Sequence, residues 1–421
     1  MKITHVSAMD ILGGAARATY RLHQGLLALG EDSTLFVGRR ESGDPSVVGL
    51  RCSLDFFDRV QRRARRLLLR RAASELGTGH RPSASHFSDD RSEYGSRIVA
   101  QLPPWDVLHL HWISGFVDHL KFFRSVPRDR PIVWTLHDMN AFTGGCHFDG
   151  GCTRYLQSCG CCPQLNSHEM SDFSHHCWNR KSRGYRVLEP SNLHLVTPSQ
   201  WLAQEARRSS LLGQHPVTVI PYGLDTEIFQ PRDSRAAREV LGLPQEAKII
   251  LFLADRATEA RKGFRHLIEA LSGIEGQSSL FLLYLGRGHV ELPPNLPKTR
   301  LEYEGNDRLL SMIYSSADVF VLPALQDNLP NTILEAQACG VPVVAFSTGG
   351  IPDLVRDGVD GRLVTCGDTR ALRDAILCTV QDDDGRRIMG ANARSKVEQE
   401  YNSETQARRY LELYRSMGAA A

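Results

Sequence analysis

Residues 2–37 read KITHVSAMDILGGAARATYRLHQGLLALGEDSTLFV and contain the repeating pattern of the whole fold. Ile3–Ser7 is a short apolar run typical of a strand, and Gly13-Gly14 follow it in a loop. Ala15–Leu29 carries Ala, Leu and Tyr at helical spacing, and Ser33–Val37 is the next strand-like run. A strand, a glycine loop, a helix and another strand in this order predict a parallel α/β sheet.

The alternation continues along the chain in two series. Further strand-forming runs of the first series lie at 106–112, 131–136, 193–197 and 217–220, and those of the second at 249–253, 280–285, 319–322 and 341–346. Helical stretches such as 266–271 and 332–339 separate them. The 421 residues exceed the roughly 250–300 at which a single core stops growing. We therefore predict an α/β protein with two Rossmann-like domains that face each other across a cleft.

The domain boundary is expected where Pro221, Gly223 and Pro231 interrupt the pattern. The predicted domains are 1–216 and 217–400. The last segment, 401–421, should form a helix that crosses back to the first domain. In open parallel sheets the ligand lies at the carboxyl ends of the strands, so loops at these ends are the places to search for a site.

Composition and charge narrow the class of function. Lys and Arg number 50 and Asp and Glu 48, for a net charge of +2, so nothing attracts the chain as a whole to nucleic acid. The first residues are too few and too polar for a signal peptide, and no run approaches the ~20 apolar residues of a membrane span. The sequence predicts a cytoplasmic protein.

The segment Pro323–Ala336 is the most informative for chemistry. Asp327 lies in a loop after a strand, and Pro330 suits the start of a helix that would carry Glu335. The free N–H groups at a helix start favour an anion, and carboxylates bind sugar hydroxyls, so the pattern is typical of a nucleotide-sugar site. The alternative is an acidic loop before an ordinary amphipathic helix.

Two other strand ends offer polar side chains. Arg256 and Lys262 follow the strand that ends at Leu253, where two cations can neutralise a diphosphate; the alternative is a solvated charged loop. His137 ends a strand of the first series, where an imidazole can hydrogen-bond a sugar or transfer a proton; the alternative is a structural histidine.

Together these segments resemble the family-four retaining glycosyltransferases of the GT-B fold, of the type active in bacterial polysaccharide and cell-wall synthesis. The resemblance covers nearly the whole chain. Its two glutamates, separated by seven residues, appear here as Asp327 and Glu335, and its Arg and Lys, six positions apart, as Arg256 and Lys262. Other matches are Gly13-Gly14, His137, the hinge segment Pro221–Asp225 and the loop Thr348–Pro352.

The resemblance implies a role for each matched residue. Arg256 and Lys262 would hold the donor pyrophosphate, Glu335 the ribose, and Asp327 the transferred sugar. Backbone N–H groups near Asn331 and Thr332 would bind phosphate, Gly13 and Gly14 would let the backbone approach it, and His137 would lie beside the sugar. Asp327 is one methylene shorter than the family's Glu, which bears on the choice of sugar.

The implied reaction is retaining transfer of a hexose-type sugar from a UDP- or GDP-sugar to a glycan or a lipid-linked glycan. No cofactor is expected for catalysis, because no Asp-x-Asp metal motif follows a strand. Asp382-Asp383-Asp384 fits that pattern but is expected to be a solvated turn. The alternatives are a nucleotide-sugar epimerase or other GT-B enzyme, and a non-catalytic nucleotide-sugar binding protein.

Two segments lie outside this pattern. Cys146, Cys152, Cys159 and Cys162 have a C-x5-C-x6-C-x2-C spacing that can hold a structural zinc, with disulfides or free thiols as alternatives. An arginine-rich stretch at 59–71 predicts a basic helix that contacts anionic lipid at the inner face of the membrane; the alternative is a soluble helix paired with acidic neighbours.

Overall fold

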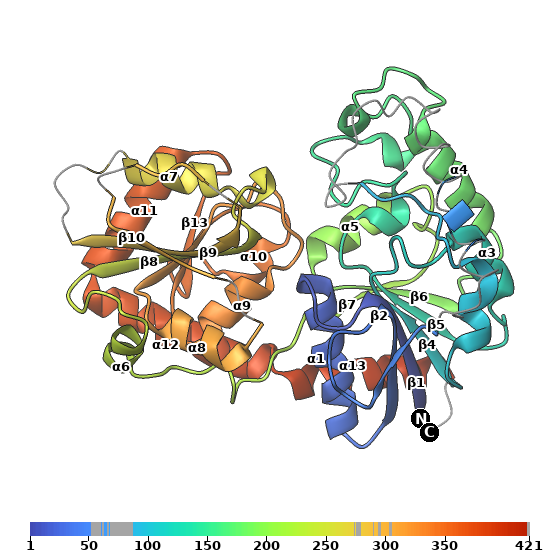
Figure 1. Ribbon diagram of the computed structural model, residues 1–421, viewed down its shortest axis with the longest axis horizontal. Coiled ribbons are helices and arrows are strands. Elements are labelled where there is room, and N and C mark those ends of the chain that lie inside the picture. Colours follow the sequence, from blue (N-terminus) through green and yellow to red (C-terminus); the bar gives the residue numbers. More distant parts are fainter. Residues whose placement is uncertain are drawn as a thin grey trace. The chain divides into compact units, whose positions relative to one another are not determined.

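A computed structural model describes residues 1–51, 60, 63, 64, 67, 87–272, 274, 279–288, 290–293, 296–302 and 305–418. The chain divides into two compact units (Figure 1): Met1–Ile220 with Ala407–Ala421, and Pro221–Gln406. The first change between the units, after Ile220, lies close to the boundary expected at 216/217. The predicted lipid-binding stretch 59–71 lies outside the described residues, apart from the isolated positions 60, 63, 64 and 67.

The first unit contains a seven-stranded parallel sheet of order β3-β2-β1-β4-β5-β6-β7. Its strands are β1 (Lys2–Met9), β2 (Asp32–Arg39), β3 (Val47–Gly49), β4 (Val107–Leu110), β5 (Ile132–Thr135), β6 (Leu193–Thr197) and β7 (Val217–Val219). Its α-helices include α1 (Gly14–Ala28), α3 (His119–Ser125), α4 (Phe173–Tyr185), α5 (Gln200–Arg208) and, from Ala407 on, α13 (Ser403–Ser416).

Successive strand residues of this sheet pack on opposite faces, as the period of two requires. Ile3 and Val107 join a buried cluster with α1 and α13, whereas Val6 and Leu108 join the cluster beneath α3, α4 and α5. Figure 1 shows these two layers of helices on either side of the sheet. Both faces of the central strands are therefore covered.

The second unit contains a six-stranded parallel sheet of order β10-β9-β8-β11-β12-β13. Its strands are β8 (Lys248–Arg256), β9 (Leu280–Arg287), β10 (Lys298–Leu301), β11 (Val319–Leu322), β12 (Val343–Phe346) and β13 (Gly361–Val364). Its helices include α6 (Ser234–Val240), α7 (Phe264–Ser272), α8 (Asp307–Ser315), α9 (Asn331–Ala338), α10 (Ile351–Leu354), α11 (Thr369–Gln381) and α12 (Asp383–Glu400). Figure 1 shows α7 and α11 on one face of this sheet and α8, α9 and α12 on the other.

Two Rossmann-like parallel-sheet units confirm the predicted α/β class. One local prediction was wrong: Asp382 caps α12 by accepting the Gly385 N–H at 2.9 Å, and Asp383 and Asp384 form the first turn of that helix rather than a free turn. The acidic run suits the positive end of the helix dipole. Within the described part of the chain, no helix is long and apolar enough to cross a membrane.

Candidate functional site

The loops that follow β8 and β11 are bound backbone to backbone in the second unit. Leu325 N–H donates to the Arg261 carbonyl at 2.8 Å. Gly263 has a φ of +73°, and a Cβ there would lie 1.7 Å from the Pro323 carbonyl oxygen. Only glycine fits at this position, because any side chain would push the two loops apart.

Asp327 lies at the point where these loops meet. Its carboxylate accepts from Lys262 Nζ at 2.7 Å and from Arg261 Nη1 at 3.1 Å, and its side chain is only 10% exposed. Burial raises the pKa of Asp327, but the charges of Lys262 and then Arg261 outweigh it and leave the pKa below its usual value. Asp327 is therefore an ionised, cation-bound carboxylate.

A third loop fixes the backbone of Asp327. Gly349, in the loop between β12 and α10, has a φ of +55°, and a Cβ there would lie 1.9 Å from the Asp327 carbonyl oxygen. Gly350 N–H donates to the same oxygen at 3.0 Å. The sequence segments around Lys262, Asp327 and Gly349 are thus brought together at the carboxyl ends of β8, β11 and β12.

The start of α9 offers groups for an anion. The helix begins at Asn331 after Pro330, and no side chain caps its first turn. The buried Thr332 Oγ1 has no hydrogen-bond partner among the described residues. Glu335 lies one turn further along, 3% exposed, and accepts the Tyr314 hydroxyl of α8 at 3.0 Å. A helix start, where the dipole favours an anion, together with an unused hydroxyl is the chemistry of a phosphate site.

Arg256 and Arg261 occupy different environments. Arg256 ends β8 after an irregularity in its pairing with β9, and its exposed side chain has no ion-pair partner within the described ranges. Arg261 instead binds Asp327, the Gln326 carbonyl at 2.7 Å and Glu259 at 2.8 Å. The sequence interpretation assigned no role to Arg261; its position next to Lys262, in a loop after a strand, was the available signal.

In the first unit, Gly13 and Gly14 begin α1. Gly13 has a φ of +92°, and its missing side chain faces open space. The preceding buried Asp10 accepts the backbone N–H groups of Glu41 at 3.0 Å and Ser42 at 2.8 Å, which anchors this loop to the end of β2. Asp10 was not predicted as a site residue, because its partners lie 31 and 32 positions away.

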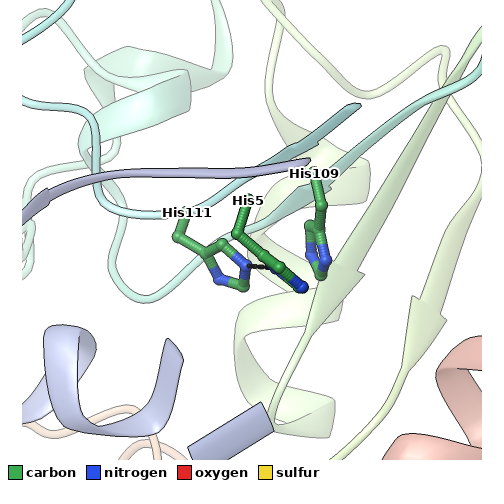
Figure 2. A group of neighbouring side chains, drawn as sticks. All are labelled: His5, His109 and His111. Carbon is green, nitrogen blue, oxygen red and sulfur yellow. Dashed lines mark hydrogen bonds between the residues drawn. The ribbon is translucent and has the colours of Figure 1, made fainter. Parts of the chain in front are cut away.

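His137 follows β5 and joins a group of buried imidazoles. Its Nε2 lies 3.2 Å from His111 Nδ1, and His111 Nε2 lies 2.9 Å from His5 Nδ1. Burial lowers the pKa of His137 to about 4, although the neighbouring Asp138 opposes the shift. Figure 2 shows His5, His109 and His111, which bring one ring nitrogen each to within 4.8 Å of one another. His137 is therefore a neutral imidazole at neutral pH.

Asp138 ties this histidine region to the cysteine segment. It accepts from Trp112 Nε1 at 2.9 Å and from His147 Nδ1 at 2.6 Å, and the Asn140 N–H donates to its other oxygen at 2.8 Å. Burial raises the pKa of Asp138, but His147 and these hydrogen bonds outweigh it and lower the pKa.

The four cysteines of the predicted zinc loop are all free thiols. Cys146 hydrogen-bonds to Cys162, which raises the pKa of Cys146, and Cys159 and Cys152 add smaller effects of the same sign. The thiols therefore cluster. Sulfurs around a tetrahedral zinc lie about 3.8 Å apart; among the described residues, however, no three of these four lie within 4.8 Å of one another. A zinc would have to draw the side chains closer, and it stays a proposal.

The two-unit architecture is that of the GT-B glycosyltransferases. The alignment with a sucrose-phosphate synthase from Thermosynechococcus elongatus covers 100% of both chains, with a TM-score of 0.68 and 20% sequence identity. The alignment with Anabaena HepE in complex with UDP-glucose covers 99% of this chain and 100% of the HepE chain, with a TM-score of 0.64 and 16% sequence identity. At such identities the likeness establishes the fold.

A family model matches a segment within the second unit. The model of a family described as Glycosyl transferases group 1 matches residues 247–382, the segment that carries Lys262, Asp327 and Glu335. D-inositol 3-phosphate glycosyltransferase of Mycobacterium bovis (strain BCG / Pasteur 1173P2) is 29% identical over 290 residues. That match covers 65% of this chain and 53% of the relative, so the chain spans about half the length of that protein.

Proposed function

We propose that this chain is a glycosyltransferase that binds a nucleoside-diphosphate sugar in its second unit and transfers the sugar with retention of configuration. The observation that carries the proposal is the joining of Lys262, Asp327 and the uncapped start of α9 at one edge of the sheet. The similarity of residues 247–382 to group 1 glycosyl transferases supports it.

Donor binding would use three kinds of group. Lys262 and Arg256 supply positive charge for the pyrophosphate, and the first N–H groups of α9 with Thr332 Oγ1 bind phosphate oxygens. Glu335 accepts a ribose hydroxyl while Tyr314 holds its carboxylate in place. Asp327 accepts a hydroxyl of the sugar, and Arg261 keeps this carboxylate oriented. The UDP-glucose of the Anabaena HepE complex suggests a UDP-sugar as the first donor to try.

The chemical step we propose needs no enzyme nucleophile and no metal. The bond between the sugar C1 and the leaving phosphate oxygen breaks, with its electron pair going to that oxygen. The acceptor hydroxyl oxygen bonds C1 on the same face, and its proton passes to the leaving phosphate. Arg256 and Lys262 stabilise the charge that develops on the phosphate, and neutral His137 hydrogen-bonds the sugar. The acceptor proposed is a glycan or a lipid-linked glycan.

A donor-binding assay tests the assignment of the site. Thermal unfolding of the full chain should shift upward with UDP- or GDP-sugars, with and without EDTA, because a ligand that binds only the folded state stabilises it. Lys262→Ala and Glu335→Ala should abolish the shift and the transfer of a radiolabelled sugar. Lys248→Ala is the matched control, since Lys248 begins β8, the strand that precedes Lys262, and pairs with surface Asp383.

Each alternative activity gives a distinct result. Conversion of the nucleotide sugar to its epimer in the absence of an acceptor would favour an epimerase. A thermal shift without any turnover would favour a binding protein. An unchanged shift and transfer in Lys262→Ala or Glu335→Ala would refute the assigned site.

A further inference from the structure

Three imidazoles form a hydrogen-bonded row that ends at His137. His5 lies in the middle of β1, His111 follows β4 directly, and His137 lies two residues after β5, so the row crosses three neighbouring strands of the sheet. The contacts are 2.9 Å between His5 Nδ1 and His111 Nε2, and 3.2 Å between His111 Nδ1 and His137 Nε2. Both nitrogens of His111 are therefore engaged.

The row allows only two arrangements of its protons. Burial lowers the pKa of all three rings, so each is neutral and has one N–H and one lone pair. In one arrangement every Nδ1 is protonated and His137 accepts at Nε2; in the other every Nε2 is protonated and His137 donates. His5 Nε2, buried without a partner among the described residues, ends the row. The tautomer of His137 is thus coupled to that of His111.

From this geometry we propose that His111, supported by His5, is a positioning residue that fixes the ring orientation and the tautomer of His137 for the proposed sugar transfer. His111 is 3% exposed, so it would act through His137. The expected effect of His111 on the rate of sugar transfer rests on the proposed function. The coupling of the two rings rests on the geometry alone.

A metal ion held by His5, His109 and His111 is the competing interpretation. His109 Nδ1 is joined to the Tyr414 hydroxyl at 2.7 Å, and His109 Nε2 to Thr135 Oγ1 at 2.7 Å. A metal would have to take a lone pair from a nitrogen that already has a hydrogen bond in His109 and in His111. No carboxylate is among the three, so the site would leave the ion's charge uncompensated in the core. The geometry favours the hydrogen-bonded row.

Two amide substitutions at residue 111 separate positioning from packing. The amide of His111→Asn lies near the position of Nδ1 and can bond His137, whereas the amide of His111→Gln lies near Nε2 and can bond only His5. We expect His111→Asn to keep kcat within about threefold of the wild type, and His111→Gln to lose about tenfold or more in kcat with an unchanged KM for the donor. Urea unfolding of both variants controls for stability.

A spectroscopic readout does not depend on turnover. In the full chain with ¹⁵N-labelled histidine, His137, assigned by its loss in His137→Ala, should show one neutral tautomer at pH 7. His111→Gln should turn this signal into a mixture, and His111→Asn should not. In a His137→Ala background, His111→Gln should cause no further loss of kcat, because the two residues act as a unit.

Several results would overturn the proposal. Two are kinetic: equal losses of kcat in the two amide variants, or a further loss of about tenfold in kcat when His111→Gln is added to His137→Ala. The others are a mixture of His137 tautomers in the wild type, and one transition-metal ion per chain that is lost in His109→Ala. If the wild type transfers no sugar, the proposed function fails, and the tautomer measurement still decides whether His111 fixes His137.

Discussion

Lowering the pH from 7 to 5.5 should strongly destabilise the first unit. Burial lowers the pKa of eight of its histidines, moderately for His194 and His215 and strongly for six others. The six are His5, His23, His109, His111, His119 and His137. In the unfolded chain each would titrate at about 6.5. A base whose folded pKa is lowered gives stability that is complete above the unfolded pKa and is lost as pH falls, since the unfolded state then binds protons that the folded state does not.

The magnitude follows from this linkage. If the six strongly shifted rings stay neutral in the folded state, each costs about 1.2 kcal/mol of stability between pH 7 and 5.5, so six cost about 7 kcal/mol. Asp90 acts in the opposite direction, because burial raises its pKa to about 6 and the folded state binds a proton in this range. Protonation of Asp90 offsets about 0.8 kcal/mol, which leaves a net loss of about 6 kcal/mol. Such a loss is as large as the whole stability of many domains.

Tryptophan fluorescence during urea unfolding measures this loss in the first unit specifically. All five tryptophans, at 105, 112, 134, 178 and 201, lie in Met1–Ile220. The His119→Gln variant should reduce the pH dependence by about a fifth, whatever its stability at pH 7. His168→Gln, at an exposed site, should leave it unchanged. A change below about 1 kcal/mol in the wild type between pH 7 and 5.5 would refute the neutral buried cluster.

Three further predictions concern the second unit and the cysteines. Asp327→Asn leaves Lys262 without its carboxylate partner and Arg261 with Glu259 alone, and should lower the free energy of unfolding by about 2–4 kcal/mol in calorimetry. Asp327→Glu keeps the charge and should cost less; equal losses would contradict the ion-pair role. Gly349→Ala should lower the free energy of unfolding more than Gly358→Ala and should weaken donor binding. Both glycines have a positive φ, but only at Gly349 would the new Cβ clash with a carbonyl oxygen; equal losses of about 1 kcal/mol would mean that backbone strain is the whole effect. Metal analysis should find about one zinc per chain, which a chelator removes with a fall in Tm and which Cys146→Ser loses; zinc-free native protein would leave the four residues as core thiols.

The sequence predicted the sheets well because their strands are buried on both faces. Val319–Leu322 and Leu193–Thr197 read as apolar β-rich runs between helices, and the structure begins and ends both strands at these residues. Lys262 and Asp327 were expected in one site, and the structure joins them by an ion pair. Both features depend on local pattern or on the rule that ligands gather at strand ends.

Other features depend on register and loop geometry, which one sequence does not specify. His5 lies opposite His109 only because β1 pairs with β4 in that register. Whether Arg256 or Arg261 reaches Asp327 depends on the path of the chain after β8. The two arginines are chemically equal in the sequence, and the structure distinguishes them by the bonds of Arg261 to Asp327, Gln326 and Glu259.

The last helix makes the first unit discontinuous in sequence. Tyr410 and Tyr414 are buried in its core, where they bond Thr135 at 2.8 Å and His109 at 2.7 Å, although the chain between has formed another unit. During synthesis, residues 1–220 leave the ribosome long before these two tyrosines are made. A nascent chain would therefore hold this unit with part of its core open to water, and expression of residues 1–220 alone should give a protein that aggregates unless a peptide spanning 403–418 is supplied.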